Sequence, residues 1–551
     1  MIKKMYNLTT NELTKFLVKP SILIIIALIF ISSILVPLIP KAIMSHEAGF
    51  TTDMYHFQLG AINGEVKGLN TKKVNDKNKE TFLKSQKAQV QLLIDSKVEA
   101  TGWRYNVANE YLMTLTQIDT IHLLKENITP ATILASLPPQ VSPQTIKETL
   151  AIPSSEYASA LKKLDAKKTK LYNDVKNNNY IGYFTKEITS NKAQVKNLEK
   201  ELTALNAKLK KEPTSMDLKT QITKLNDTIN TLNSIIKIDQ YRVDHKIPFS
   251  KKNWKSATLT NLEQLAGSSQ TQMATKTQFL SSPHKSVTYE QYVAKFKQDQ
   301  MITNNKIKAN WYSLEHNIPQ TQFQNASSRD VTNSFVALYS MIAIVFTLIL
   351  ASGLISAEFS KGTIKLLLIR PVSRFKILLS KLIAVYIIGY FVLFGSMILL
   401  TISSGILFGF SDYLTPILKI SSGVIVTHAY IGSLILAILY LSLSVLLFTT
   451  LAFTLSIVTK STAASLASSL IIFIGAPIIT IILFTKDFIW FDITPLPYLN
   501  LPFVGVIKVF SSMFNSKAIL SHSLGGIEVA ILTIILAIIG FVVFIKSDVN
   551  S

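Results

Sequence analysis

Residue types that usually carry catalysis are thinly spread along this chain of 551 residues. It contains no cysteine, and no G-x-x-x-x-G-K-[ST] loop is present to cradle the phosphates of ATP. The histidines fit no metal-ligand spacing: they are His46, His56, His122, His245, His284, His316, His428 and His522. We therefore expect no enzyme activity, cofactor or metal site in the chain itself. Any ATP it uses must be bound by a partner subunit.

The most informative polar residues lie in the segment 357–376, which reads A-E-F-S-K-G-T-I-K-L-L-L-I-R-P-V-S-R-F-K. Gly362 allows a sharp turn there. Residues 363–369 can form a short helix, and Pro371 disfavours helix at the residue before it. Ser373 can cap the helix that follows. The segment is thus expected to present a short basic helix that is held at both ends.

Long apolar runs flank this segment and must position it. A membrane-spanning helix needs about 20 apolar residues. Six such runs are predicted, at 20–44, 331–356, 377–410, 429–458, 463–484 and 524–545. The first could be a signal peptide, but its apolar stretch exceeds a typical h-region, so an uncleaved span is favoured. The predicted fold class is therefore an all-α polytopic membrane protein with about six transmembrane helices.

Basic residues mark one side of the predicted spans. They lie before the first run, between the second and third, between the fourth and fifth, and after the sixth: Lys3, Lys4, Lys15, Lys19, Lys361, Lys365, Arg370, Arg374, Lys376, Lys381, Lys460 and Lys546. The positive-inside rule assigns that side to the cytoplasm. Both termini are then cytoplasmic, in the plasma membrane. Residues 331–551 form a membrane domain of five helices, and 45–330 lie outside the cell.

The outside segment reads as mainly helical. Apolar residues recur in heptad-like steps on both sides of a break at Pro213, which predicts a coiled-coil-like hairpin over about 186–240. Ser215 can cap its second arm. The hairpin could project as a stalk or belong to a compact bundle. Its lysines indicate either a solvated face or attraction to an anionic polymer or lipid. The lack of disulfides is compatible with a Gram-positive bacterium.

The segment 357–376 resembles the ABC-2 permease family, whose members carry E-x-x-x-G-T-hydrophobic-x-x-L-L-x-x-P-x-S-R after the second span. In that family the segment includes the coupling helix, which docks on the ATPase. Residues 1–19 look like the family's amphipathic elbow helix, and 495–522 look like its re-entrant region, although a membrane-skimming loop is the alternative. The resemblance implies coupling roles for Glu358, Gly362, Thr363, Ile364, Leu367, Pro371, Ser373 and Arg374, and a second inside turn at Thr459, Lys460 and Ser461.

The resemblance implies a permease subunit of an ABC transporter. It would pair as a homodimer or with a related permease, contact membrane lipid, and be driven by a separate ATPase subunit. Export of amphipathic or lipid-like cargo, including antimicrobial peptides, is the expected direction. The alternative is a protein that does not transport. It would be a cell-surface receptor of the kind used in phage infection, or an accessory membrane protein of the kind found in type VII secretion. A secondary carrier is less favoured because charges inside the spans are scarce; Glu528 is expected at the interface. The net charge of +22 suits a membrane protein with an aqueous insert rather than a nucleic-acid partner.

Overall fold

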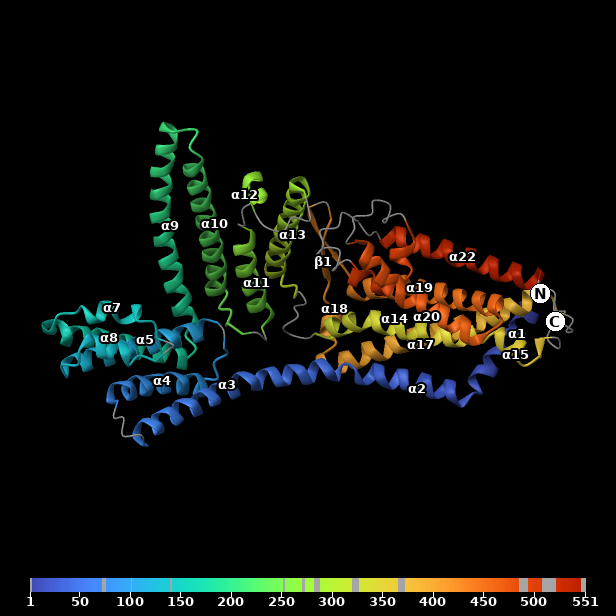
Figure 1. The fold of residues 1–551 in the computed structure, drawn as a ribbon, viewed down its shortest axis with the longest axis horizontal. Helices are drawn as coiled ribbons and strands as arrows, with labels where there is room; N and C mark the ends of the chain where they lie inside the picture. The colour runs from blue at the N-terminus through green and yellow to red at the C-terminus, as the bar shows by residue number, and fades with distance from the viewer. Residues whose placement is uncertain are drawn as a thin grey trace. The chain divides into compact units, whose positions relative to one another are not determined.

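The computed structural model describes residues 2–71, 76–100, 102–138, 141–250, 253–269, 273–281, 288–319, 327–364, 372–421, 423–484, 494–507 and 522–546. The chain forms two compact units. The membrane unit comprises Met1–Lys41, Met273–Asn305 and Glu315–Ser551, and the helical unit comprises Ala42–Gln272 and Lys306–Leu314. Nearly all the secondary structure is α-helix, which confirms the predicted fold class (Figure 1).

Six helices are long and apolar enough to cross a membrane: Pro20–Ile43, Ser328–Ser360, Arg374–Phe408, Tyr430–Thr459, Thr462–Leu483 and Ser523–Lys546. The shortest has 22 residues, which suffices because a helix rises about 1.5 Å per residue and the hydrocarbon core is about 30 Å thick. The main helices of these spans are α2 (Pro20–Leu35), α14 (Ser328–Ser352), α15 (Ser356–Ser360), α17 (Arg374–Phe408), α19 (Tyr430–Thr459), α20 (Thr462–Phe484) and α22 (His522–Lys546).

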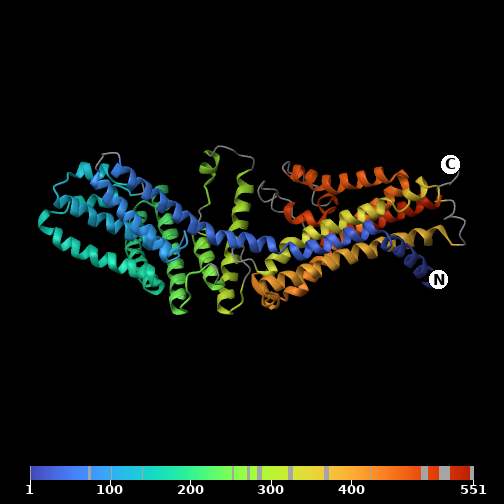
Figure 2. The same cartoon turned by 90° about the horizontal axis from the view of Figure 1, so that it is seen from below.

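Helices α14, α17 and α19 lie side by side at the centre of the membrane unit (Figures 1 and 2). Small residues allow the close approach. A Cβ at Gly389 of α17 would lie 2.4 Å from Thr347 Cγ2 of α14, so no larger residue fits without a shift. The buried hydroxyls in this core bond mostly to their own helices, as Thr347 does to the Ile344 carbonyl and Ser340 to the Val336 carbonyl. These hydroxyls therefore do not remain unpaired in the apolar interior.

Helix α1 (Ile2–Leu17) lies within residues 1–19, where an elbow helix is predicted, and it packs against α17 and α2. At the other end of the spans, α18 (Ser411–Leu414) precedes a small antiparallel hairpin of β1 (Ile417–Ser421) and β2 (Val424–His428). Gly423 enters the second strand with φ +81°, a conformation that glycine adopts readily. The sequence reasoning did not anticipate this hairpin. It joins the third and fourth spans.

The remaining described elements of the membrane unit are short, or are shared with the helical unit at a boundary along the chain. They are α12 (Lys276–Ser281), most of α13 (Tyr289–Glu315), and the 3₁₀ turns η3 (Leu496–Tyr498) and η4 (Leu501–Phe503). The two 3₁₀ turns fall in the predicted re-entrant region, where Tyr498 and Leu501 pack with Leu447 and Val529 in a small apolar cluster. Most of the rest of that region, 508–521, lies outside the described residues.

The helical unit is built from most of α3 (Leu38–Thr71), α4 (Lys77–Asp95), α5 (Trp103–Lys125), α6 (Pro130–Ala135), α7 (Gln144–Leu150), η1 (Ser154–Glu156), α8 (Tyr157–Lys176), α9 (Tyr180–Lys211), α10 (Met216–Asp244) and α11 (Trp254–Ser269). Its largest core cluster includes Leu93, Trp103, Ala108 and Val175. The helix α3 runs to Thr71, so the helix that begins near the end of the first predicted span does not stop at residue 44.

Helices α9 and α10 form the predicted hairpin and lie side by side (Figure 1). The Ser215 side chain accepts a hydrogen bond from the Leu218 amide, as a cap of the second arm should. Buried residues of the arms occur near their base, as with Ile188 and Ile238, whereas none lies between 196 and 228. The outer half of the hairpin therefore stands clear of the other described helices of its unit.

Candidate functional site

The end of the second span contains a break and a sharp turn. Helix α14 ends at Ser352, α15 covers Ser356–Ser360, and Gly362 then adopts φ +68°. Side chains with a Cβ rarely adopt this left-handed conformation, at a cost of about 1–2 kcal/mol. A Cβ added at Gly362 would meet no atom of the described residues within 4 Å, so the requirement for glycine there comes from its backbone conformation. This turn is the one that the sequence predicted.

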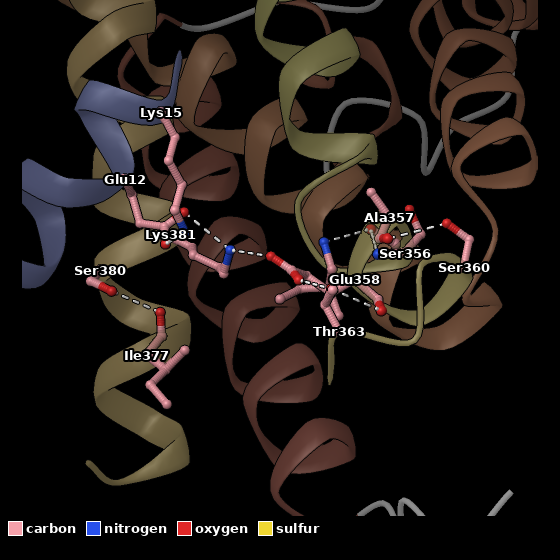
Figure 3. Close-up of polar contacts among 12 residues, drawn as sticks. Glu12, Lys15, Ser356, Ala357, Glu358, Ser360, Thr363, Ile377, Ser380 and Lys381 are labelled. Atoms are coloured by element: carbon pink, nitrogen blue, oxygen red, sulfur yellow. Dashed lines mark hydrogen bonds and ion pairs between the residues drawn. The ribbon is translucent and has the colours of Figure 1, made fainter. Parts of the chain in front are cut away.

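A buried lysine joins three elements at this turn (Figure 3). Lys381 of α17 is 3% exposed, and its Nζ lies 3.0 Å from Glu12 Oε2 of α1 and 3.2 Å from Glu358 Oε1 of α15. Thr363 Oγ1 donates a short hydrogen bond to Glu358 Oε2. Lys15 reaches the other oxygen of Glu12 at 2.7 Å. Because removing an ammonium from water is costly, the two carboxylates hold Lys381 in place and tie the elbow helix to the second and third spans.

The predicted second inside turn lies against the same helix end. Lys460 has φ +53°, and its Nζ lies 5.2 Å from the centre of the Phe359 ring. In the turn itself, the Ser461 amide donates to Thr459 Oγ1 at 3.3 Å. The turn residues that the sequence predicted therefore contact the segment that follows the second span.

Hydroxyl groups complete the connection between these two segments. Ser456 Oγ of α19 accepts hydrogen bonds from the amides of Ile355 and Ser356, at 3.4 and 3.0 Å. These amides lie where α14 breaks and would otherwise lack helical acceptors. Ser356 Oγ also lies 2.7 Å from Thr462 Oγ1 at the start of α20. The break in the second span is thus satisfied by the fourth and fifth spans.

The remaining predicted coupling residues divide into two groups. Ile364 is buried in the main apolar cluster, and Arg374 donates to the Ile545 carbonyl of α22 at 3.2 Å. Ser373 occupies the cap position of α17 as predicted, but its side chain makes no cap hydrogen bond, so that part of the prediction is wrong. Leu367 and Pro371 belong to 365–371, outside the described residues, as does most of the short helix expected at 363–369.

Taken together, these contacts form one junction, which we call the cytoplasmic-end junction after the side that the positive-inside rule predicts for it: Glu12, Lys15, Ser356, Glu358, Phe359, Gly362, Thr363, Lys381, Ser456, Lys460 and Thr462. No group of three metal-ligating side chains is found among the described residues. The contacts join α1 to the ends of several spans. They also connect the segment around Gly362 to α17 and α19.

The sequence reasoning did not foresee the pairing of Lys381 with Glu12 and Glu358. The sequence nevertheless contains a pattern that indicates this pairing. Glu12 is the only acidic residue before the first span, and Glu358 is the only one between the second and third, although both flanks are rich in lysine and arginine. Lone acidic residues in two basic flanks are candidates for a shared counterion. Residue spacing alone could not bring residues 12 and 381 together.

One family model matches mainly the membrane part of the chain. Residues 292–550 match a family described as "Protein of unknown function (DUF2705)". "Uncharacterized protein YhcI" of Bacillus subtilis (strain 168) is 30% identical over 247 residues, which cover 44% of this chain and 76% of that protein. "Uncharacterized membrane protein YdbK" of the same organism is 36% identical over 101 residues, which cover 18% of this chain and 39% of that protein. No solved structure matches the chain. The six apolar helices and the likeness to YdbK indicate a multi-pass membrane protein.

Proposed function

This chain belongs to the same family as YhcI of Bacillus subtilis, and from that premise we propose that it is the membrane-spanning permease subunit of an ABC transporter. It would be driven by a separate ATPase subunit and would pair as a homodimer or with a related permease. The proposed location is the plasma membrane of a Gram-positive bacterium, with both termini in the cytoplasm. The relatives in Bacillus subtilis fit that source.

The observation that carries the proposal is the cytoplasmic-end junction. A coupling segment must pass the movement of an ATPase to the spans, so it must be fixed to them on more than one side. Glu358 and Thr363 are fixed to Lys381 of the third span, and Phe359 is fixed to Lys460 after the fourth. An ordinary cytoplasmic loop needs no such connections. The arrangement therefore supports a coupling role for the turn at Gly362.

Export of amphipathic or lipid-like cargo, including antimicrobial peptides, is the proposed activity. Its support is the resemblance of 357–376 to the ABC-2 pattern, together with the few charges in the candidate spans, each of which has at most two acidic or basic residues in its most apolar window. A path built from such spans suits cargo with a large apolar part better than a small ion.

Copurification with an ATPase tests the proposal. The tagged full chain, isolated from its native membrane, should carry an ABC ATPase whose hydrolysis is stimulated by the chain. Gly362→Val should abolish the stimulation while leaving the ATPase bound, because valine disfavours φ +68° and redirects the turn. Gly423→Val is the matched control: it forces the same kind of strain at φ +81°, in the hairpin at the other end of the spans.

Charge reversal supplies a second comparison. Arg374→Glu would break the hydrogen bond to the Ile545 carbonyl, whereas Lys376→Glu changes the same charge two residues away. Stimulation should fall in the Arg374 variant and persist in the Lys376 variant. If a copurified ATPase turns over normally with both Gly362→Val and Arg374→Glu, the coupling role is wrong.

A second candidate function is a non-transporting surface receptor or secretion-accessory protein. The observation that favours it is the hairpin of α9 and α10, whose outer half has no buried residue between 196 and 228 and so offers two long exposed faces. Such a protein would need no ATPase. A tagged chain that is folded and inserted, yet copurifies with no ATPase, would favour this candidate over the transporter.

A further inference from the structure

The membrane unit contains a cavity of about 1070 Å³ between the elbow helix α1, the start of α2 and the end of the second span. Its apolar wall includes Ile22, Ile25, Phe346, Ile349 and Leu350. The volume slightly exceeds the range of about 300–1,000 Å³ that is common for small-molecule sites. Ile349 is 46% exposed and Ile25 is 38% exposed, so this wall is not filled by other described side chains.

The other wall of the cavity is cationic. Four lysines line it, namely Lys15, Lys19, Lys361 and Lys381, against two acidic residues, Glu12 and Glu358. Both acidic residues are already engaged, since Lys381 lies between them and Lys15 takes the second oxygen of Glu12. The lining therefore carries two positive charges in excess.

Lys19 and Lys361 account for this excess. Both are exposed, and neither has an acidic partner within 4 Å among the described residues. The Lys19 Nζ lies 5.8 Å from the centre of the Phe16 ring, which is a weak contact that leaves its hydrogen-bond donors available. The two ammonium groups come from different elements, Lys19 from the residue before α2 and Lys361 from the residue after α15, and both line the cavity.

We propose that this cavity binds one anionic phospholipid, with its phosphate between Lys19 and Lys361 and the upper part of its acyl chains against Ile25 and Ile349. Basic pockets between spans on the cytoplasmic side are suited to acidic headgroups. An apolar wall beside the two cations selects an amphipathic anion over free phosphate. The lipid comes from the leaflet at this end of the spans, which is the cytoplasmic leaflet in the proposed topology.

The bound lipid would bridge the elbow helix region to the turn at Gly362. Lys19 directly precedes α2, and Lys361 directly precedes Gly362. Lys381 already connects Glu12 to Glu358 in this region, and the phosphate would add a second bridge, between Lys19 and Lys361. The composition of the membrane would thereby influence the cytoplasmic-end junction. This inference does not depend on the chain being a transporter.

Native mass spectrometry of the full chain in a neutral detergent tests the site. The chain is titrated with dioleoyl phosphatidylglycerol, and with dioleoyl phosphatidylcholine, which has the same acyl chains but no net charge. We expect one tightly bound phosphatidylglycerol. The double variant K19Q/K361Q should bind it roughly 25-fold more weakly, at about fivefold for each lysine near an anionic headgroup. The control K376Q/K546Q removes two charges from the same end of the spans without touching the cavity lining.

The apolar wall and the free anion are tested separately. Ile349→Trp fills the acyl side of the cavity at an exposed position, so it should weaken phosphatidylglycerol binding even if the lysine variant folds poorly. Glycerol 3-phosphate should not displace the lipid at a comparable concentration. Equal loss of binding in K19Q/K361Q and K376Q/K546Q overturns the proposal. It is likewise overturned if phosphatidylcholine binds as tightly, or if glycerol 3-phosphate competes and Ile349→Trp has no effect.

Discussion

At the scale of single residues, Lys381 is the side chain on which the cytoplasmic-end junction depends. It is 3% exposed, and Glu12 and Glu358, at 13% and 23%, supply the opposite charge from two other elements. A buried ion pair contributes little net stability when complete, but removal of one partner leaves uncompensated charge. The two carboxylates therefore constrain this position to a cation.

Lys381→Met is expected to destabilise the protein by about 2 kcal/mol or more, because Glu358 would lose its cationic partner and Glu12 would keep only Lys15. Thermal unfolding of the purified chain in detergent measures the effect. Lys376→Met, on the same helix α17, is the matched control and should change little. The triple variant with Glu12→Gln and Glu358→Gln should recover part of the loss. Equal melting temperatures of the two lysine variants would contradict the prediction.

A second buried ionisable group lies in the helical unit. Asp239 of α10 is 4% exposed, and burial raises its pKa to about 7. The carboxylates of Glu263 and Glu187 contribute to this raised pKa beside burial, while the Arg242 guanidinium opposes it. Arg242 is itself fully buried and pairs with Glu263 at 3.2 Å. A raised carboxyl pKa means that ionisation of Asp239 is disfavoured in the folded protein.

The stability of the helical unit should therefore depend on pH. The contribution of a group with a raised pKa is present below its unfolded value, about 3.9, and is lost as the pH rises through about 7. The unit should be less stable at pH 8 than at pH 5, by on the order of 2 kcal/mol from Asp239. Tryptophan fluorescence reports this unfolding, because Trp103, Trp254 and Trp311 of the four tryptophans lie in that unit.

Asp239→Asn should flatten this pH dependence and stabilise the unit at pH 8. Some slope should remain, because burial also raises the pKa of Asp119 to about 6. Asp244→Asn, at an exposed position of the same helix, is the control and should leave the slope unchanged. A slope that is the same in both variants would show that Asp239 ionises normally in the folded protein.

At the scale of elements, the break between α14 and α15 decides where the second span ends and the turn begins. The chain leaves regular helix at Gly353, and the amides of Ile355 and Ser356 turn to Ser456 of α19 for their acceptor. A broken helix inside a membrane protein is stable only when such groups find other partners. The fourth span thus stabilises the shape of the second.

Ser456→Ala should remove the acceptor of both amides and cost about 1–3 kcal/mol, since Ile355 and Ser356 are fully buried. Hydrogen exchange of the peptide that covers 352–360 should accelerate. Ser469→Ala is the matched control, because Ser469 is equally buried but bonds only to the Ser465 carbonyl of its own helix. Ser456→Thr keeps the hydroxyl and should keep the protection. Unchanged exchange in Ser456→Ala would mean that the break needs no external acceptor.

At the scale of the whole molecule, the chain combines a membrane unit with a helical unit inserted between its first and second spans. The family match begins at residue 292, so most of the helical unit lies outside it. This division agrees with the segregation of apolar and basic residues along the sequence. The proposed topology places the two ends of the spans on opposite sides of the membrane.

The absence of cysteine makes this topology measurable. Single cysteines at Met216, in the hairpin turn, and at Val424, in the β-hairpin, are expected to react with an impermeant maleimide in intact cells. The native side chains at these two positions are 66% and 64% exposed. A cysteine at Ser360, which is also exposed, should react only after the membrane is permeabilised. Labelling of the Ser360 position in intact cells would reverse the proposed orientation.

The sequence by itself determined the fold class, the six spans and the helical hairpin. These depend on local rules: the length of an apolar run, the periodicity of apolar residues, and the effects of Pro213, Ser215 and Gly362 on the backbone near them. Each of those signals is contained within a few residues, so no tertiary contact was needed to read it. The β-hairpin at 417–428 escaped notice because it lies between two long apolar runs that dominate the pattern.

Only the tertiary structure decided which residues form the junction and the cavity. Residues 12, 358 and 381 come from three elements, and so do Ile25, Ile349 and Lys361 around the apolar and basic walls. Sequence patterns describe neighbours along one helix, whereas the packing of α1, α2, α14 and α17 sets which side chains meet. The choice of Lys381 as the shared partner of two distant carboxylates follows from that packing, because a buried cation must be neutralised by whatever acidic groups lie within reach.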